Sequence, residues 1–91
     1  MAIGIYFGQG NFPAEKYNEA ISRLESVGAG APDGRSYHVA LESDGKIQVF
    51  DVWESQEKFD AFGATLMPIL SDLGIDPGPP MVQPVVNVIK G

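Results

Sequence analysis

His38 is the single histidine of this 91-residue chain, and imidazole is the side chain that most readily gains and loses a proton near neutral pH. The dipeptide Asp44-Gly45 between two apolar runs predicts a two-residue hairpin turn, which places His38 directly opposite Asp51 on the neighbouring strand. A carboxylate in this position can orient an imidazole for general base catalysis. His38 and Asp51 are therefore the candidate catalytic pair. The alternative is a hydrogen-bonded cross-strand pair with a purely structural role.

Three further side chains are candidates for ligand binding. Tyr6 falls on the opposite side of the first predicted strand from its apolar neighbours, so its hydroxyl group could bond to an oxygen of a ligand. Asn87 is the polar residue of an otherwise apolar run at positions 85–89. Trp53 could stack on a ligand, although aromatic residues more often anchor a subunit interface. These three residues complete the predicted site.

Metal and cofactor chemistry finds little support in the sequence. The chain has no cysteine and one histidine, which argues against a thiolate nucleophile, a disulfide or a dedicated zinc site. The segment 8–11 (GQGN) lacks the third glycine of a dinucleotide-binding turn. Neither a nucleophilic-serine motif nor a phosphate loop occurs. We therefore expect no bound cofactor and no metal.

The composition is that of an ordinary globular domain, with 44% hydrophobic and 20% charged residues. The formal net charge of −6 and the scattered basic residues disfavour nucleic acid and membrane surfaces as partners. No apolar run approaches the roughly 18–20 residues of a membrane span, and the N-terminus lacks the features of a signal peptide. We expect one domain, residues 1–91, located in the cytoplasm.

The candidate residues need a scaffold, and hydrophobic periodicity predicts one with both strands and helices. Short β-rich runs predict strands at 2–8, 35–43, 46–54 and 85–89. Apolar residues at helical spacing predict helices at 14–27 and 56–73. We expect Pro68 to kink or split the second helix, and a proline-rich connector at 75–84 to precede the last strand.

The order β-α-β-β-α-β of the predicted elements favours one fold over the others. Right-handed crossovers and the packing of sequential neighbours favour a ferredoxin-like α+β fold, in which a four-stranded antiparallel sheet carries both helices on one face. The chain leaves the other face of the sheet uncovered. Because the run at 46–53 is apolar on both sides, the sequence indicates that a partner subunit covers this second face.

The alternation along this strand predicts which side meets which layer. We expect Phe50 and Val52 to lie beneath the helices of the same chain. The opposite side carries Ile47, Val49 and Trp53 together with the candidate catalytic pair. We expect this second side to form the interface of a two-fold homodimer, because a monomer would expose a large apolar patch there.

Several segments give the chain a resemblance to a known group of proteins. The stretches 51–62 (DVWESQEKFDAF), 66–70 (LMPIL) and 84–87 (PVVN) resemble the dimeric α+β barrel superfamily, and within it small bacterial proteins related to antibiotic-biosynthesis monooxygenases. The resemblance implies two ferredoxin-like subunits joined sheet to sheet, each with a pocket between sheet and helices or at the sheet interface. Such proteins include cofactor-free oxygenases, isomerases, haem-dependent enzymes, stress-induced proteins and proteins with no assigned activity.

Two hypotheses about function remain. The first is an enzyme that acts on a small apolar or aromatic molecule without a bound cofactor, as a monooxygenase or isomerase. In it His38 is the base and Asp51 orients the imidazole. The second is a homodimer that binds a hydrophobic metabolite without catalysis, or a stress-related module. The first predicts a mainly apolar cavity into which His38 points, near the break expected at Pro68.

Overall fold

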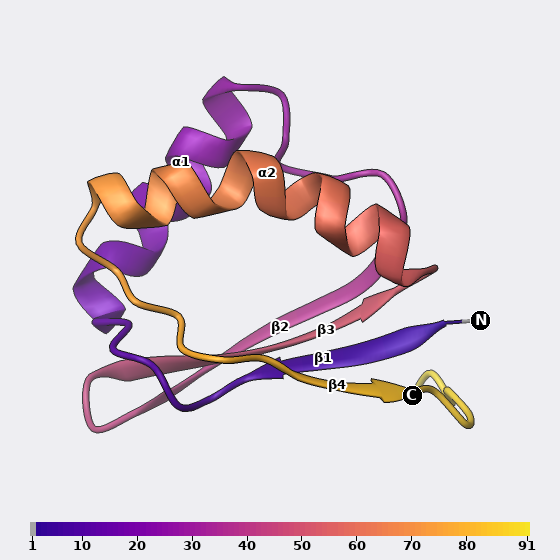
Figure 1. Cartoon of the computed structure of the whole chain (residues 1–91). Coiled ribbons are helices and arrows are strands. Elements are labelled where there is room, and N and C mark those ends of the chain that lie inside the picture. The colour runs from indigo at the N-terminus through magenta and orange to yellow at the C-terminus, as the bar shows by residue number, and fades with distance from the viewer. Residues whose placement is uncertain (1) are drawn as a thin grey trace.

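The computed structural model describes residues 2–91 (Figure 1). Its strands are β1 (Ile3–Phe7), β2 (Arg35–Ser43), β3 (Lys46–Trp53) and β4 (Met81–Pro84). Its helices are α1 (Tyr17–Ser26) and α2 (Gln56–Asp72), and a turn of 3-10 helix at Ala14–Lys16 leads into α1. The elements therefore follow the predicted order, although the last strand lies elsewhere in the sequence than expected.

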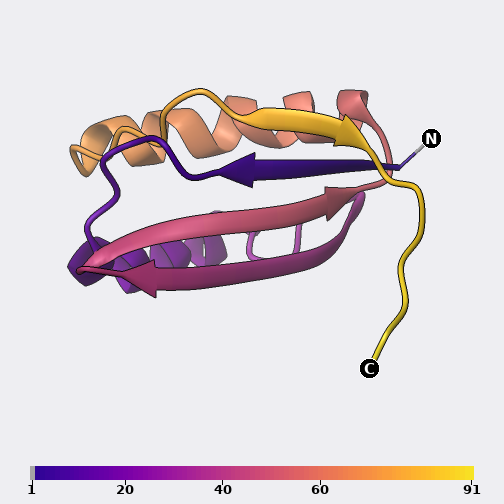
Figure 2. The same cartoon turned by 90° about the horizontal axis from the view of Figure 1, so that it is seen from below.

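All four strands join one antiparallel sheet in the order β2-β3-β1-β4 (Figure 2). Helix α1 lies in the connection from β1 to β2, and α2 lies in the connection from β3 to β4. Both helices lie on the same side of the sheet (Figure 1). This arrangement confirms the predicted ferredoxin-like α+β fold of the chain.

The β2–β3 hairpin turns through Asp44 and Gly45, whose φ angles of 52° and 77° lie in the left-handed region. Two left-handed residues give the turn a twist that matches the flanking strands, and glycine adopts this conformation without steric cost. His38 accordingly pairs with Asp51, which confirms the predicted register of the hairpin.

A β-bulge near the start of β2 changes this register locally. It lies between Arg35 and Tyr37, so that Arg35 rather than Ser36 lies opposite Trp53. An extra residue on one strand reverses the alternation of the side chains on one side of the bulge. As a result, Arg35 and His38 both reach the side of the sheet that the helices cover.

The helices cover the side of the sheet that we expected to face a second subunit. Trp53 of β3 is fully buried beneath α2. The centroid of its ring lies 5.6 Å from the centroid of the Phe59 ring and 5.2 Å from that of the Phe62 ring. Val49 and Asp51, on the same side of β3, are also buried. The predicted assignment of the two faces was therefore wrong, and Trp53 belongs to the core of its own subunit.

The first strand determines which side of the sheet faces the helices. Ile3, Ile5 and Phe7 form the more apolar side of β1, and the register pairs Ile3 with Trp53 and Phe7 with Val49. The apolar sides of the two central strands thus coincide, and burying the combined surface is favourable in proportion to its area. The sequence of β3 is apolar on both sides, so by itself it did not show which side faces the helices.

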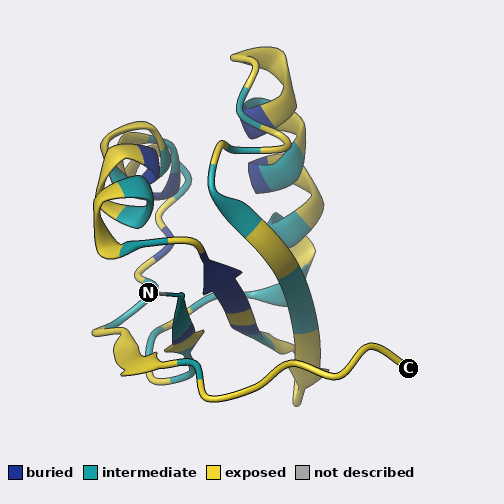
Figure 3. Ribbon diagram, turned by 90° about the vertical axis from the view of Figure 1, so that its right-hand side faces the viewer, coloured by how far each residue is buried: buried dark blue, intermediate teal, exposed yellow. Residues whose placement is uncertain are grey.

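The opposite face of the sheet remains uncovered, and we refer to it as the open face (Figure 3). It carries large hydrophobic side chains that are 36–54% exposed, namely Tyr6, Tyr37, Leu41, Phe50 and Met81. The C-terminal segment passes along this side of the sheet (Figure 3). The helices therefore leave one apolar face uncovered, apart from the part that the C-terminal segment passes.

The fourth strand lies at Met81–Pro84, which corrects the prediction of a strand at 85–89. Its pairing ends with a hydrogen bond from the Val85 N–H to the Ala2 carbonyl oxygen. Because β1 begins next to Ala2, the β-branched run that follows has no strand of the described chain beside it, and Val86 is 98% exposed. The residue pattern at 85–89 identified β-forming residues, but it could not show whether a neighbouring strand is present for them to pair with.

Helix α2 continues through Pro68, so of the two predicted outcomes, a kink or a split, the structure excludes the split. Ser55 caps its start, because its side-chain oxygen accepts a hydrogen bond from the Lys58 N–H at 3.3 Å. Beyond the proline, Leu70 is buried against Ala20 of α1. This packing outweighs the loss of one backbone hydrogen bond. Neither helix in residues 2–91 is long and apolar enough to cross a membrane.

Candidate functional site

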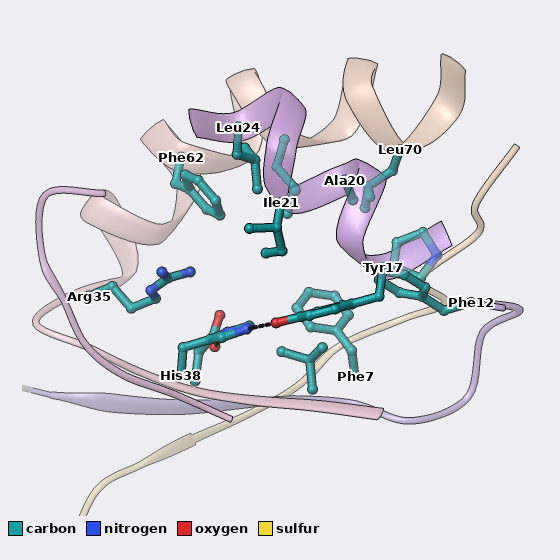
Figure 4. A pocket seen from close by; sticks show the side chains of 14 residues that line it. Phe7, Phe12, Tyr17, Ala20, Ile21, Leu24, Arg35, His38, Phe62 and Leu70 are labelled. Atoms are coloured by element: carbon teal, nitrogen blue, oxygen red, sulfur yellow. Dashed lines mark hydrogen bonds and ion pairs between the residues drawn. The ribbon is translucent and has the colours of Figure 1, made fainter. Parts of the chain in front are cut away.

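A cavity lies between the sheet and the two helices (Figure 4). The space open to the centre of a water-sized sphere is about 60 Å³. Its walls are mostly apolar and include Phe7, Val49, Ile21, Leu24, Phe62 and Leu66. The polar side chains that reach the same space are Tyr17, Arg35, His38 and Asp51. An apolar enclosure with a few converging polar groups is typical of a ligand-binding site.

Three of these polar side chains form a continuous hydrogen-bonded chain, of which Figure 4 shows the link between Tyr17 and His38. The Tyr17 hydroxyl lies 2.8 Å from His38 Nε2, and His38 Nδ1 lies 2.6 Å from Asp51 Oδ1. An ionised carboxylate only accepts hydrogen bonds, so Nδ1 carries a hydrogen and donates it to Asp51. In the neutral ring, Nε2 then accepts from the Tyr17 hydroxyl. His38 is thereby held in one tautomer, with its basic nitrogen directed at Tyr17.

Asp51 is buried, and both of its oxygens are engaged. The residue is 4% exposed, Oδ1 accepts from His38, and Oδ2 accepts from the Trp53 indole N–H at 3.4 Å. A buried charge needs such partners because the loss of hydration is costly. Asp51 can also stabilise the imidazolium ion that forms when His38 takes up a proton. Within the described chain, every buried side-chain nitrogen or oxygen has a hydrogen-bond partner.

Burial raises the pKa of Tyr17 above the ordinary tyrosine value of 10.0. The positive charge of Arg35 lowers this pKa, and the negative charge of Asp51 raises it. Tyr17 is therefore a neutral phenol at neutral pH and can donate one hydrogen bond. If His38 becomes protonated, Nε2 turns from acceptor into donor, and the Tyr17 hydroxyl is then free to donate to a ligand.

Arg35 brings a positive charge to one end of the cavity. Its guanidinium carbon lies 5.9 Å from the centroid of the Phe62 ring (Figure 4), and Nη2 donates to the Gly30 carbonyl oxygen at 3.2 Å. It forms no ion pair with any carboxylate of residues 2–91. Its charge is therefore available to a bound molecule.

The chemistry that these groups offer is proton transfer and hydrogen bonding. His38 can accept a proton, Tyr17 can donate a hydrogen bond, and Arg35 can balance a negative charge. No three His, Asp or Glu side chains of the described chain gather as a possible metal-ion site.

The structure separates the predicted site residues into two groups. His38 and Asp51 lie together at the cavity. Trp53 lies in the core beside them and reaches the site through its hydrogen bond to Asp51. Tyr6 and Asn87 lie at the open face, where they line a separate groove beside the C-terminal segment. These two residues therefore do not meet His38 within one subunit.

Sequence reasoning missed two polar residues of the cavity, Tyr17 and Arg35. Tyr17 occupies an apolar position of the first helix, where its ring resembles an ordinary core side chain; a hydroxyl group in such a stripe was the available signal. Arg35 reaches the cavity through a bulge that no sequence signal announced. The cavity lies between the sheet and α2 as predicted, and Leu66 and Leu70, which flank Pro68, line it, whereas Pro68 itself does not.

The sequence matches no protein-family model and no curated protein. Solved structures, by contrast, share its fold. A proposed antibiotic biosynthesis monooxygenase from Chloroflexus aurantiacus J-10-fl is 15% identical, with a TM-score of 0.65 over 99% of this chain and 98% of that chain. A variant of SnoaB, a cofactor-independent oxygenase from Streptomyces nogalater, is 13% identical, with a TM-score of 0.67 over 99% and 98%. A proposed antibiotic biosynthesis monooxygenase from Deinococcus radiodurans is 11% identical, with a TM-score of 0.64 over 99% and 97%.

These similarities extend over nearly the whole length of each chain. They confirm that the chain has the fold of antibiotic biosynthesis monooxygenase-like proteins, as the sequence resemblance implied. One fold supports many different activities, so at this level of identity the function must be argued from the cavity and its residues.

Proposed function

We propose that this protein binds a small apolar or aromatic molecule in the cavity and removes a proton from it without a bound cofactor, as a monooxygenase or an isomerase. One observation carries the proposal: the hydrogen-bonded chain Tyr17–His38–Asp51 reaches a largely apolar cavity. His38 is the proposed base, Asp51 orients it, and Tyr17 offers a hydrogen bond to an oxygen of the ligand.

Proton transfer starts from a ligand whose O–H, or C–H next to a carbonyl, lies within hydrogen-bonding distance of His38 Nε2. Before Nε2 can take up this proton, the Tyr17 hydroxyl must leave Nε2 and turn toward the oxygen of the ligand. Asp51 stabilises the imidazolium ion, while Tyr17 and Arg35 stabilise the negative charge that develops on the ligand. The apolar walls exclude water and so strengthen these interactions.

The resulting anion has two possible fates. In isomerisation, His38 returns the proton to a different carbon atom and the ligand keeps its electrons. In oxygenation, a CH₂ group reacts with molecular oxygen and becomes a carbonyl, while the second oxygen atom leaves as water, so that the ligand supplies all the electrons. The similarity in fold to SnoaB, named as a cofactor-independent oxygenase, makes oxygenation the first fate to test.

We also infer that two copies assemble through the open face. It is the face of the sheet that the helices leave uncovered, and side chains such as Tyr37, Leu41 and Phe50 expose a third to a half of their surface there. Large exposed apolar patches are typical of interaction sites, and a two-fold axis would pair this face with itself. The inferred homodimer is still joined sheet to sheet, but through the side opposite to the one predicted.

The alternative is a non-catalytic homodimer that binds a hydrophobic metabolite or serves as a stress-related module. Two observations favour it: the cavity measures only about 60 Å³, and Tyr17 already occupies the hydrogen-bonding position at His38 Nε2. In this case the Tyr17–His38–Asp51 chain is a fully satisfied structural network.

A small-molecule screen separates the two functions. Hydrophobic aromatic and quinone-like compounds are tested for a rise in melting temperature and for quenching of Trp53 fluorescence, and each hit is assayed for oxygen uptake and for product. We expect His38→Ala to abolish turnover while it weakens binding less, because the base acts on the reacting proton. The control is Asn18→Ala on the exposed side of α1. Turnover that survives in His38→Ala, or the absence of any stabilising ligand, rules out the proposed enzyme.

A further inference from the structure

We propose that the ligand of this cavity is a small carboxylate with a short apolar tail, and that Arg35 is the residue that selects it. The inference deepens the proposed function and rests on it, because it assumes that the cavity receives a ligand. Three features of the cavity support it: a cation without a carboxylate partner, apolar walls and a small volume.

The cation is the Arg35 guanidinium group, which points into the cavity (Figure 4). It is held by the hydrogen bond to the Gly30 carbonyl oxygen and by its position over the Phe62 ring. A guanidinium group has five N–H donors arranged in a planar fork, and the bond to Gly30 uses one of them. Two parallel donors of the fork match the two oxygens of a carboxylate, which arginine binds with paired hydrogen bonds.

Asp51 also lines the cavity, so its negative charge bears on the choice of ligand. Its oxygens are bound by His38 Nδ1 at 2.6 Å and by the Trp53 indole N–H at 3.4 Å. The charge of Asp51 is therefore directed at these donors. Arg35 has no such carboxylate partner in the described chain, and its guanidinium group is near enough to Tyr17 to offset in part the burial that raises the pKa of Tyr17.

The volume limits the apolar part of the ligand. The cavity measures about 60 Å³, against roughly 150 Å³ for an apolar cavity that admits benzene. A short aliphatic chain that carries one carboxylate is therefore the expected occupant. An aromatic ring enters only if side chains of the wall move. The apolar side chains of α1 and α2 give the tail a surface that excludes water.

Matched pairs of charged and neutral ligands test this inference. Butyrate is compared with butyramide, which has a similar shape and no charge, and benzoate is compared with benzamide. Binding is followed by NMR titration of the cavity residues at an ionic strength kept constant with sodium chloride. Arg35→Gln removes the charge, and Arg35→Lys keeps the charge without the fork. Arg23→Gln is the control, because Arg23 pairs with Asp72 and does not line the cavity.

We expect butyrate to bind about ten- to a hundredfold more tightly than butyramide, as hydrogen bonds to a charged group predict. Arg35→Gln should abolish this preference by weakening butyrate much more than butyramide, whereas Arg35→Lys should keep part of the preference and Arg23→Gln all of it. Butyrate should also bind more tightly than benzoate if the cavity limits the size of the tail.

Equal affinities for butyrate and butyramide, or a preference that survives in Arg35→Gln, overturn the role of Arg35 and leave the ligand-binding cavity in place. Tighter binding of benzoate than of butyrate overturns the short tail. If no member of either pair shifts the signals of cavity residues, this inference fails; the proposed function fails as well only if the screen of aromatic and quinone-like compounds also finds no ligand.

Discussion

His38 is held from two sides, because Asp51 binds its Nδ1 hydrogen and Tyr17 occupies Nε2. A base in this position can act only when Tyr17 gives way, so the hydroxyl of Tyr17 controls access to His38. The pair of His38 and Asp51 could be predicted from the sequence, since a two-residue turn fixes which residues oppose each other across a hairpin. Tyr17 could not, because its contact with His38 depends on where α1 packs on the sheet.

The first prediction at this scale concerns the ionisation of Tyr17. In a protein with Tyr6→Phe and Tyr37→Phe, the ultraviolet absorbance of the phenolate reports on Tyr17 alone. We expect a midpoint above pH 10.0, because burial disfavours the charged form. Arg35→Gln should raise the midpoint further, and Asp51→Asn should lower it. A midpoint at or below 10.0 contradicts the burial of this hydroxyl group.

The raised pKa of Tyr17 also links stability to pH. The folded protein holds this proton more tightly than the unfolded chain, so the contribution of Tyr17 is complete below pH 10.0 and is lost as the pH rises through the raised pKa. We therefore expect the single-tyrosine protein to lose stability above pH 10.0 more steeply than the same protein with Tyr17→Phe. Parallel losses in urea unfolding experiments would show that Tyr17 does not carry the effect.

The second prediction concerns Asp51→Asn, which keeps the shape of the side chain and removes its charge. An amide offers one acceptor oxygen and an N–H₂ donor, so either the His38 or the Trp53 N–H loses its partner inside the core, or His38 must adopt the other tautomer and reverse its bond to Tyr17. We expect the free energy of unfolding to fall by about 1–3 kcal/mol. Asp33→Asn is the matched control, because Asp33 is exposed and its pairing with Lys58 should matter little. Equal stability of wild type and Asp51→Asn in urea would argue against the buried network.

At the scale of the elements, the location of each strand and helix was easier to predict than the face it buries. The sequence of β3 is apolar on both sides, and only its register with Ile5 and the rest of β1 determines that Trp53 faces the helices. The run at 85–89 shows the same limit, since β-forming residues make a strand only where a partner strand is present. Tertiary packing also kept α2 continuous through Pro68, so the helix is not split there.

The prediction at this scale concerns Pro68, which lies on an exposed turn inside α2. Pro68→Ala restores a backbone N–H and removes the clash of the proline ring with the preceding turn. We expect it to raise the free energy of unfolding by about 1 kcal/mol or more, without altering ligand binding. Met67→Ala at the neighbouring exposed position should change stability little. A destabilised Pro68→Ala protein would mean that the proline is required for the packing of the helix.

At the scale of the whole molecule, the sequence identified the fold class, but it assigned to a partner subunit the side of the sheet that the helices of the same chain cover. The apolar excess of β3 remains the reason to predict a partner, because a one-chain sheet with helices on one side leaves its other side open. The structure shows that the open face carries Tyr6, Tyr37 and Phe50. Within a homodimer through this face, Tyr6 and Asn87 would belong to the interface and His38 to the cavity on the far side of each sheet.

The prediction for the whole molecule is that wild-type protein is a dimer at low micromolar concentration in light scattering. Leu41→Asp places a charge in the open face and should yield a monomer, because a buried unpaired charge is costly. Val27→Asp is the control, since Val27 is similarly exposed at the end of α1 and lies outside the open face. A monomeric wild type, or a dimer in Leu41→Asp, would place the interface elsewhere or remove it.

Proton abstraction by His38 is the central claim, and hydrogen–deuterium exchange measures it without requiring the final product. The enolisable compounds 2-oxobutyrate and 2-butanone are incubated in deuterated buffer with wild-type protein, His38→Ala or an equal concentration of free imidazole, and the loss of the proton signal beside the carbonyl is followed by NMR. We predict that wild type exchanges at least one of them about a hundredfold faster than free imidazole, and that His38→Ala abolishes this excess. Exchange by wild type no faster than by free imidazole, or equal exchange by His38→Ala, would contradict the claim.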